Sequence, residues 1–123
     1  MATIKAYTDL EQSKKLAEIL PIESADMYFT GHQSIIKPKE WEYENVPKIK
    51  GKYISFDDKR IFYPCWSLAA LLSILPYPLL SELSNKIWKC VCYPSGICYY
   101  VTADSPIDAC YEMIIKLNEL KML

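Results

Sequence analysis

Hydrophobic and polar positions follow a helical period near both ends of the chain. Between residues 10 and 20, apolar side chains recur every three or four positions and charged ones occupy the opposite arc. Thr8 is the expected N-cap, Glu11 completes a capping box, and Pro21 ends the helix. At the other end, Asp104 or Ser105 is expected to cap an amphipathic helix that begins at Pro106.

The middle of the chain predicts one further helix. Residues 67–75 are apolar nearly all round, which is typical of a helix buried on most faces, and Pro76 and Pro78 end it. Residues 79–83 are interpreted as another short turn.

Two stretches have the pattern of β-hairpins. Residues 53–56 and 60–63 flank a short Asp-rich turn, and residues 86–93 and 97–103 flank a Pro-Ser-Gly turn. Short connections favour antiparallel pairing, because parallel strands need long crossovers. The predicted fold class is therefore α+β: a small antiparallel sheet from two hairpins, with about three helices mainly on one face.

Residues 21–51 lack a clear period, because prolines and glycines interrupt every candidate element. The segment is nevertheless rich in aromatic residues, which a solvated linker would not need. We interpret it as an irregular segment that binds a partner through an exposed apolar patch. The residues predicted to form this patch are Tyr28, Phe29, His32, Trp41 and Tyr43.

Composition bounds the classes of function. The chain has 123 residues, which predicts a single domain over residues 1–123, and its net charge of −1 favours neither nucleic acid nor a membrane surface. Five cysteines cannot all pair within one chain, and no apolar leader opens the sequence, so we expect free thiols and a cytoplasmic protein. The longest apolar run, residues 65–80, is shorter than a membrane span and is interpreted as core. No glycine-rich phosphate loop occurs, so no cofactor is predicted.

Cys65 is the sharpest catalytic candidate. It precedes a predicted helix, whose amino terminus can acidify a thiol, and His32 is the only histidine that could act as its base. An apolar setting would instead raise the pKa of the thiol, and we expect Cys65 to be structural. The alternative is a small thiol hydrolase or transferase that uses Cys65 and His32.

Cys90, Cys92 and Cys98 form the only dense cysteine group. Strand alternation places Cys90 and Cys92 on one face. A three-residue hairpin loop would bring Cys98 to that face, and a two-residue loop would turn it away. A structural zinc ion usually needs four ligands at wider spacing, so no metal site is predicted.

Basic residues between positions 37 and 60 are interleaved with aromatic ones, as in proteins that bind single-stranded nucleic acid. Five acidic residues are mixed among them, and the chain has only one arginine, Arg60. A solvated surface of mixed charge is the favoured interpretation, and a weak nucleic-acid binder is a further alternative.

Three stretches carry a resemblance to a known group: residues 7–21, Pro64-Cys-Trp-Ser-Leu68 and Ser105-Pro-Ile-Asp-Ala-Cys110. They resemble small uncharacterised proteins encoded in prophages and mobile elements of gut bacteria. The resemblance implies a bacterial or phage setting and no catalytic role for any residue. Our leading hypothesis is a non-enzymatic protein-binding or accessory module whose partner is another protein or a second copy in a homodimer.

Overall fold

The computed structural model describes residues 5–37, 39–51, 56 and 60–123. The chain divides into two compact units, Asp9–Trp66 and Met1–Thr8 with Ser67–Leu123, which we call the N-terminal unit and the C-terminal unit. The described residues form three α-helices and seven strands, and every strand pairing is antiparallel. The α+β class is therefore confirmed. The strands form two sheets, whereas the sequence pattern suggested one.

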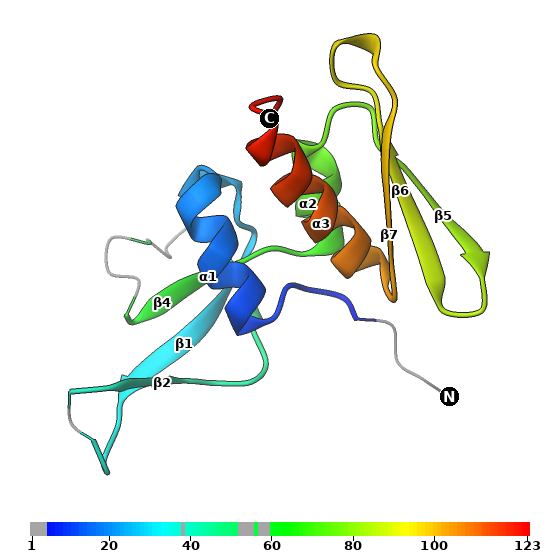
Figure 1. Ribbon diagram of the computed structural model, residues 1–123. Coiled ribbons are helices and arrows are strands. Elements are labelled where there is room, and N and C mark those ends of the chain that lie inside the picture. Colours follow the sequence, from blue (N-terminus) through cyan, green and yellow to red (C-terminus); the bar gives the residue numbers. More distant parts are fainter. Residues whose placement is uncertain (1–4, 38, 52–55, 57–59) are drawn as a thin grey trace. The chain divides into compact units, whose positions relative to one another are not determined.

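The N-terminal unit opens with the predicted helix, α1 (Leu10–Ile19), shown in blue in Figure 1. Its cap is Asp9, not Thr8. The Asp9 carboxylate accepts a hydrogen bond from the Gln12 backbone N–H at 2.8 Å, and the Gln12 side chain accepts one from the Asp9 N–H at 3.1 Å. A carboxylate also suits the positive end of the helix dipole, and Thr8 is fully buried. The capping-box motif was correct but one residue out of place.

The segment expected to be irregular contains most of the unit's sheet. After a 3₁₀ turn, η1 (Ile22–Ser24), come β1 (Met27–Gln33), β2 (Trp41–Tyr43) and β3 (Lys48–Ile49). The strands β2 and β3 each pair with β1, as does β4 (Phe62–Cys65). The expectation was wrong because Pro21 and Pro47 lie outside the strands and Gly31 is accommodated within β1.

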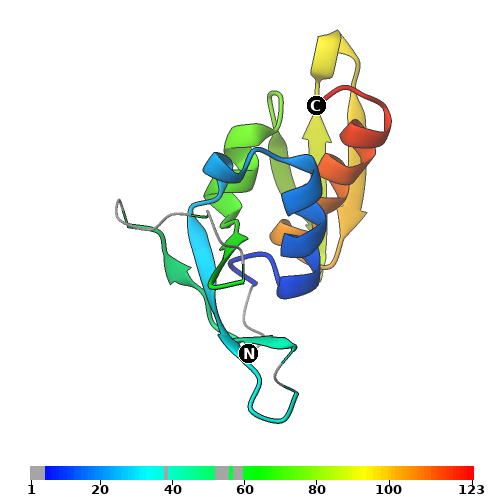
Figure 2. The same ribbon diagram turned by 90° about the vertical axis from the view of Figure 1, so that its left-hand side faces the viewer.

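Gly31 lies inside β1 and does not interrupt it. A Cβ atom at this position would meet the backbone carbonyl oxygen of Arg60 and would lie 2.6 Å from Cε1 of Tyr43. The glycine therefore allows close approach of the neighbouring chain segments. The loop between β1 and β2 projects away from α1 in Figure 2.

The first predicted hairpin is only partly described. Residues 53–55, in its first arm, lie outside the described residues. In the second arm, Phe62 and Tyr63 belong to β4, which pairs with β1. Helix α1 packs against β4, and the unit buries Leu16, Phe29 and Trp66.

The C-terminal unit contains α2 (Leu68–Ile74), β5 (Leu79–Ser84), β6 (Ile87–Cys92), the 3₁₀ turn η2 (Pro94–Gly96), β7 (Tyr99–Ala103) and α3 (Pro106–Glu119). The hairpin of β6 and β7 and the final helix are confirmed, and Ser105 is the cap of α3. Helix α2 is also confirmed, although Ala69 and Ser73 are exposed on it.

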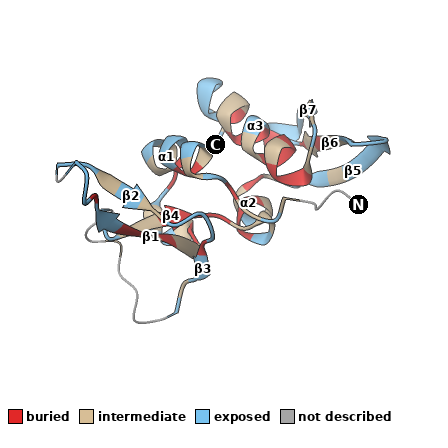
Figure 3. Ribbon diagram, turned by 90° about the horizontal axis from the view of Figure 1, so that it is seen from below, coloured by how far each residue is buried: buried red, intermediate tan, exposed pale blue. Residues whose placement is uncertain are grey.

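The interpretation of residues 79–83 as a turn was wrong, because they form β5 and pair with β6. The strand order in this sheet is β5-β6-β7. Helix α3 packs on one face of β6 and β7, beside which it lies in Figure 1, and Figure 3 marks its buried residues in red. No helix in the described part of the chain is both long enough and apolar enough to cross a bilayer.

Candidate functional site

The two residues of the catalytic alternative are not brought together. Cys65 is fully buried and pairs with Met27, whereas His32 lies five residues farther along β1 and is exposed. Strand geometry converts this offset to about 16 Å and, because the offset is odd, places the two side chains on opposite faces. The His32 Nε2 atom instead lies 3.5 Å from Glu42 Oε2. The pair needed to activate a thiol is therefore not assembled.

Six residues, 93–98, join β6 to β7, so the hairpin has neither of the two loop lengths considered from the sequence. Cys92 pairs with Tyr99, so Cys98 faces away from Cys92 and is exposed. Cys90 and Cys92 instead lie with Cys110 of α3 under the sheet, all three fully buried. A hydrogen bond to Cys110, together with burial, raises the pKa of Cys90, and burial beside Cys90 raises the pKa of Cys92 to about 12.

The thiols of Cys90 and Cys92 therefore stay protonated at neutral pH, and all three cysteines act as small core side chains. Among the described residues, no three His, Cys, Asp or Glu side chains are placed to hold a metal ion.

The predicted aromatic patch is divided between the two faces of the N-terminal sheet. Phe29 is only 2% exposed and belongs to the core, so its assignment to a partner surface was wrong. The register places Trp41 and Tyr43 on the face of Phe29, and places Tyr28 and His32 on the other. The four remaining residues do not form one continuous patch.

Neighbouring groups in the N-terminal unit partly cover these aromatic rings. Tyr28 packs edge-on against Phe62 with ring centroids 5.3 Å apart, and Tyr43 packs against Tyr63 at 5.6 Å. The Arg60 guanidinium lies 5.5 Å from the centre of the Trp41 ring. Such contacts stabilise the sheet, and a role of these side chains in binding stays a prediction.

The most exposed apolar residues of this segment are Ile35 and Ile36, which the predicted patch did not include, and Val46 and Ile49 are exposed as well. Ile35 and Ile36 lie in the loop between β1 and β2 and are 96% and 86% exposed. The sequence signal for their exposure was that two isoleucines are adjacent, which breaks the alternation of apolar and polar residues in a half-buried strand.

The basic residues between positions 37 and 60 do not form a continuous track in the described part of the chain. The Lys37 ammonium is 3.8 Å from Glu40, and that of Lys50 lies 5.0 Å from the centre of the Phe56 ring. Lys52 and Lys59 lie outside the described residues. The arrangement resembles the mixed-charge surface expected from the sequence.

The outer face of the β5-β6-β7 sheet, opposite α3, is the most extensive candidate binding surface. Leu79, Val91 and Tyr100 lie side by side across the three strands on this face. Leu79 is 60% and Tyr100 59% exposed, and the exposed Ile87 is on the same side of β6. We call these four residues the open face.

The open face carries little charge. The next row across the sheet consists of Ser81, Lys89 and Thr102, in which Lys89 is the one charged residue. Its ammonium lies 4.8 Å from the centre of the Tyr100 ring, so part of its charge is directed onto the aromatic face. The surface is therefore apolar, aromatic and held on regular backbone, which is the composition of protein interfaces rather than of a reaction centre.

Comparisons with known proteins add no evidence on function. No protein-family model matches the chain, and no curated protein or solved structure is significantly similar to it. The resemblance to prophage and mobile-element proteins therefore stays a prediction.

Proposed function

We propose that this protein is a non-enzymatic protein-binding module that self-associates through the open face of its β5-β6-β7 sheet. The observation that carries the proposal is the row Leu79, Val91 and Tyr100 on the side of the sheet opposite α3. One face of this sheet is buried by α3, whereas the other exposes an apolar row. Contiguous exposed apolar surface of this kind is typical of interaction sites.

A second copy of the chain is the proposed occupant. A two-fold interface places the same patch on both subunits, so it needs a surface that is complementary to itself. An apolar row meets this requirement, and Lys89 is the one charged side chain beside it. Two such sheets can pack face to face about 10 Å apart, as in a β-sandwich.

The size of the sheet predicts weak association. Three strands spaced about 4.8 Å apart and five residues long cover a footprint of roughly 240 Å² on each copy. Standard interfaces bury about 800 Å² of accessible surface on each partner. We therefore expect a reversible dimer with a dissociation constant in the micromolar range or weaker.

Sedimentation equilibrium over a wide concentration range tests the proposal. Wild-type protein should dimerise with rising concentration, and Leu79→Lys should abolish this because it places a charge within the apolar row of the interface. The matched control is Ile49→Lys, which changes an 80% exposed isoleucine on β3 of the N-terminal unit. Self-association that is absent in wild-type protein, or weakened equally by both substitutions, would overturn the proposal.

A further inference from the structure

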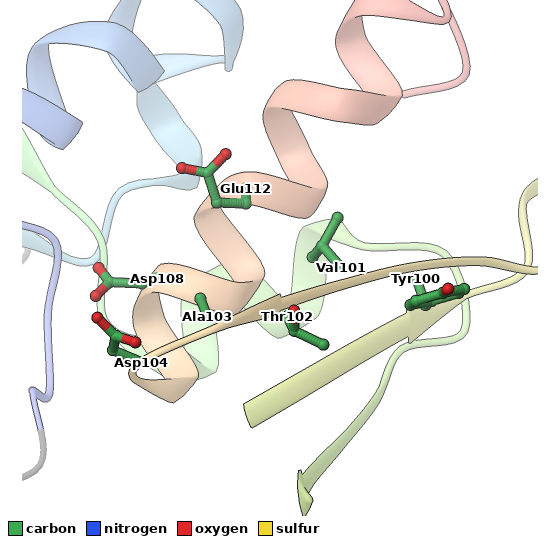
Figure 4. A pocket seen from close by; sticks show the side chains of 7 residues that line it. All are labelled: Tyr100, Val101, Thr102, Ala103, Asp104, Asp108 and Glu112. Carbon is green, nitrogen blue, oxygen red and sulfur yellow. The ribbon is translucent and has the colours of Figure 1, made fainter. Parts of the chain in front are cut away.

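A groove that shares only Tyr100 with the open face runs between β7 and α3 in the C-terminal unit. It has a volume of about 600 Å³, and residues 100–103 of β7 form one wall. Asp108 and Glu112 of α3 line the opposite side, and Figure 4 shows Asp104, which follows β7, near Asp108 at one end of the groove. Val101 and Ala103 point toward the helix in the same view.

The wall formed by β7 is an edge strand. In the described part of the chain, β7 pairs with β6 alone. The carbonyl oxygen of Tyr100 accepts a hydrogen bond from the Lys116 Nζ at 3.3 Å, so the backbone of Tyr100 points away from β6. Because strand groups alternate in direction, the N–H and C=O of Thr102 also point outward. An outward row of backbone donors and acceptors can pair with an added strand.

The spacing of the acidic side chains along the groove matches the side-chain repeat of such a strand. Asp108 and Glu112 are four residues apart on α3, which is a rise of about 6 Å. Alternate side chains of an extended strand are about 6.7 Å apart. A segment paired with β7 would therefore present every second side chain to successive carboxylates.

Charge identifies the side chains that fit. Asp104 and Glu112 have no ion-pair partner within the described part of the chain, and Asp108 binds the ammonium of Lys5 at 3.0 Å. Lys5 lies outside the helices and strands of the unit, and its ion pair shows that a lysine side chain can reach this side of the groove. At the other end of the groove, the ammonium of Lys116 donates to the Tyr100 carbonyl oxygen and that of Lys89 lies beside the Tyr100 ring.

We propose that the groove between β7 and α3 binds an extended basic segment of a partner protein by β-strand addition, with lysine or arginine at alternate positions. The backbone of the segment pairs with Thr102 and with the N–H of Tyr100, whose carbonyl oxygen already accepts a hydrogen bond from Lys116. Its cations face Asp104, Asp108 and Glu112.

The test uses the full chain and three labelled peptides in a fluorescence-anisotropy titration. Val-Lys-Val-Lys-Val should bind saturably, whereas Lys-Lys-Val-Val-Val, with the same composition but without alternation, should bind more weakly. The third peptide is Val-Lys-Val-Lys-Val with an N-methyl group on its central amide, on the edge that would pair with β7. It should lose binding, because that edge supplies the hydrogen bonds.

Two variants separate the groove from general electrostatics. Asp104→Asn combined with Glu112→Gln should weaken binding by about tenfold, since each partly exposed ion pair changes affinity several-fold. Glu82→Gln is the matched control, because Glu82 lies on β5 at the opposite edge of the same sheet and is exposed. Leu79→Lys should leave peptide binding intact, so that failure of self-association and failure of the groove are distinguished.

Saturable binding that requires alternation and the two carboxylates supports the proposal. The absence of saturable binding would overturn it. So would equal affinity for the two lysine peptides, or equal loss of affinity in the Glu82→Gln protein.

Discussion

The five cysteines should differ sharply in reactivity toward an aromatic disulfide reagent such as Ellman's reagent. Cys98 is exposed, whereas Cys65, Cys90, Cys92 and Cys110 are each 0% exposed. The difference depends on the register of the hairpin, in which Cys92 pairs with Tyr99. A slip of one residue would turn every side chain of β7 to the other face. We expect one thiol to react rapidly in the native protein and four only after unfolding.

The size of the difference follows from burial and ionisation. Burial raises the pKa of Cys92 from an ordinary value of 9.0 to about 12. Because the thiolate is the reactive form, ionisation alone slows its reaction by roughly a thousandfold at pH 8. If modification instead requires unfolding, the thiol reacts with its ordinary pKa, and a stability of about 5 kcal/mol slows the reaction by a factor of roughly 10³ to 10⁴. The slow thiols should therefore report the unfolding equilibrium rather than their own chemistry.

The assay combines kinetics with peptide mapping. Reaction at pH 8 should show one fast thiol per chain, which mass spectrometry should assign to Cys98, and Cys98→Ser should remove the fast phase. Cys92→Ser is the matched variant on the same hairpin and should keep the fast phase, at a stability cost of about 1–3 kcal/mol for a hydroxyl placed in the core. Modification of Cys92 at the same rate as Cys98 would refute the register.

Two further predictions concern stability. Gly31→Ala should lower the free energy of unfolding by about 1–3 kcal/mol in urea denaturation, because the added Cβ meets the Arg60 carbonyl oxygen. The control Gly51→Ala should change the free energy of unfolding little, because nothing lies within 4 Å of its added Cβ. Equal effects of the two substitutions would contradict the packing of β1. Since the pKa of Cys92 is raised from 9.0 to about 12, its contribution to stability is complete below pH 9 and declines as the pH rises from 9 toward 12, by up to about 1.4 kcal/mol per pH unit. Cys92→Ala should reduce this decline in urea titrations between pH 8 and pH 10.5, and an unchanged slope would contradict the burial of the thiol.

Short-range signals determined the helices and one hairpin. The apolar period and Pro21 located α1, Ser105 and Pro106 located the start of α3, and the turn after residue 93 located the hairpin of β6 and β7. Each signal acts within a few residues, through a capping hydrogen bond, a fixed proline φ or a tight turn. Local physics of this kind is almost independent of the rest of the chain.

The pairing of distant strands was decided only by the tertiary structure. β1 became the central strand of its sheet because β4, more than thirty residues later, lies beside it, and Gly31 makes room for this approach. β5 was interpreted as a turn because its strand conformation depends on pairing with β6. Burial of Phe29 depends likewise on the neighbours that cover it.

Both candidate surfaces also arise from tertiary packing. The residues of the open face lie on three strands, and the groove combines the edge of β7 with a side of α3. The sequence shows that Leu79 is apolar and that Glu112 is acidic. Packing of α3 on one face of β6 and β7 decides that Leu79 is left exposed on the other and that Glu112 lines a groove. The physical reason is that burial removes one face of each element from solvent, and a local pattern does not specify which neighbour will cover it.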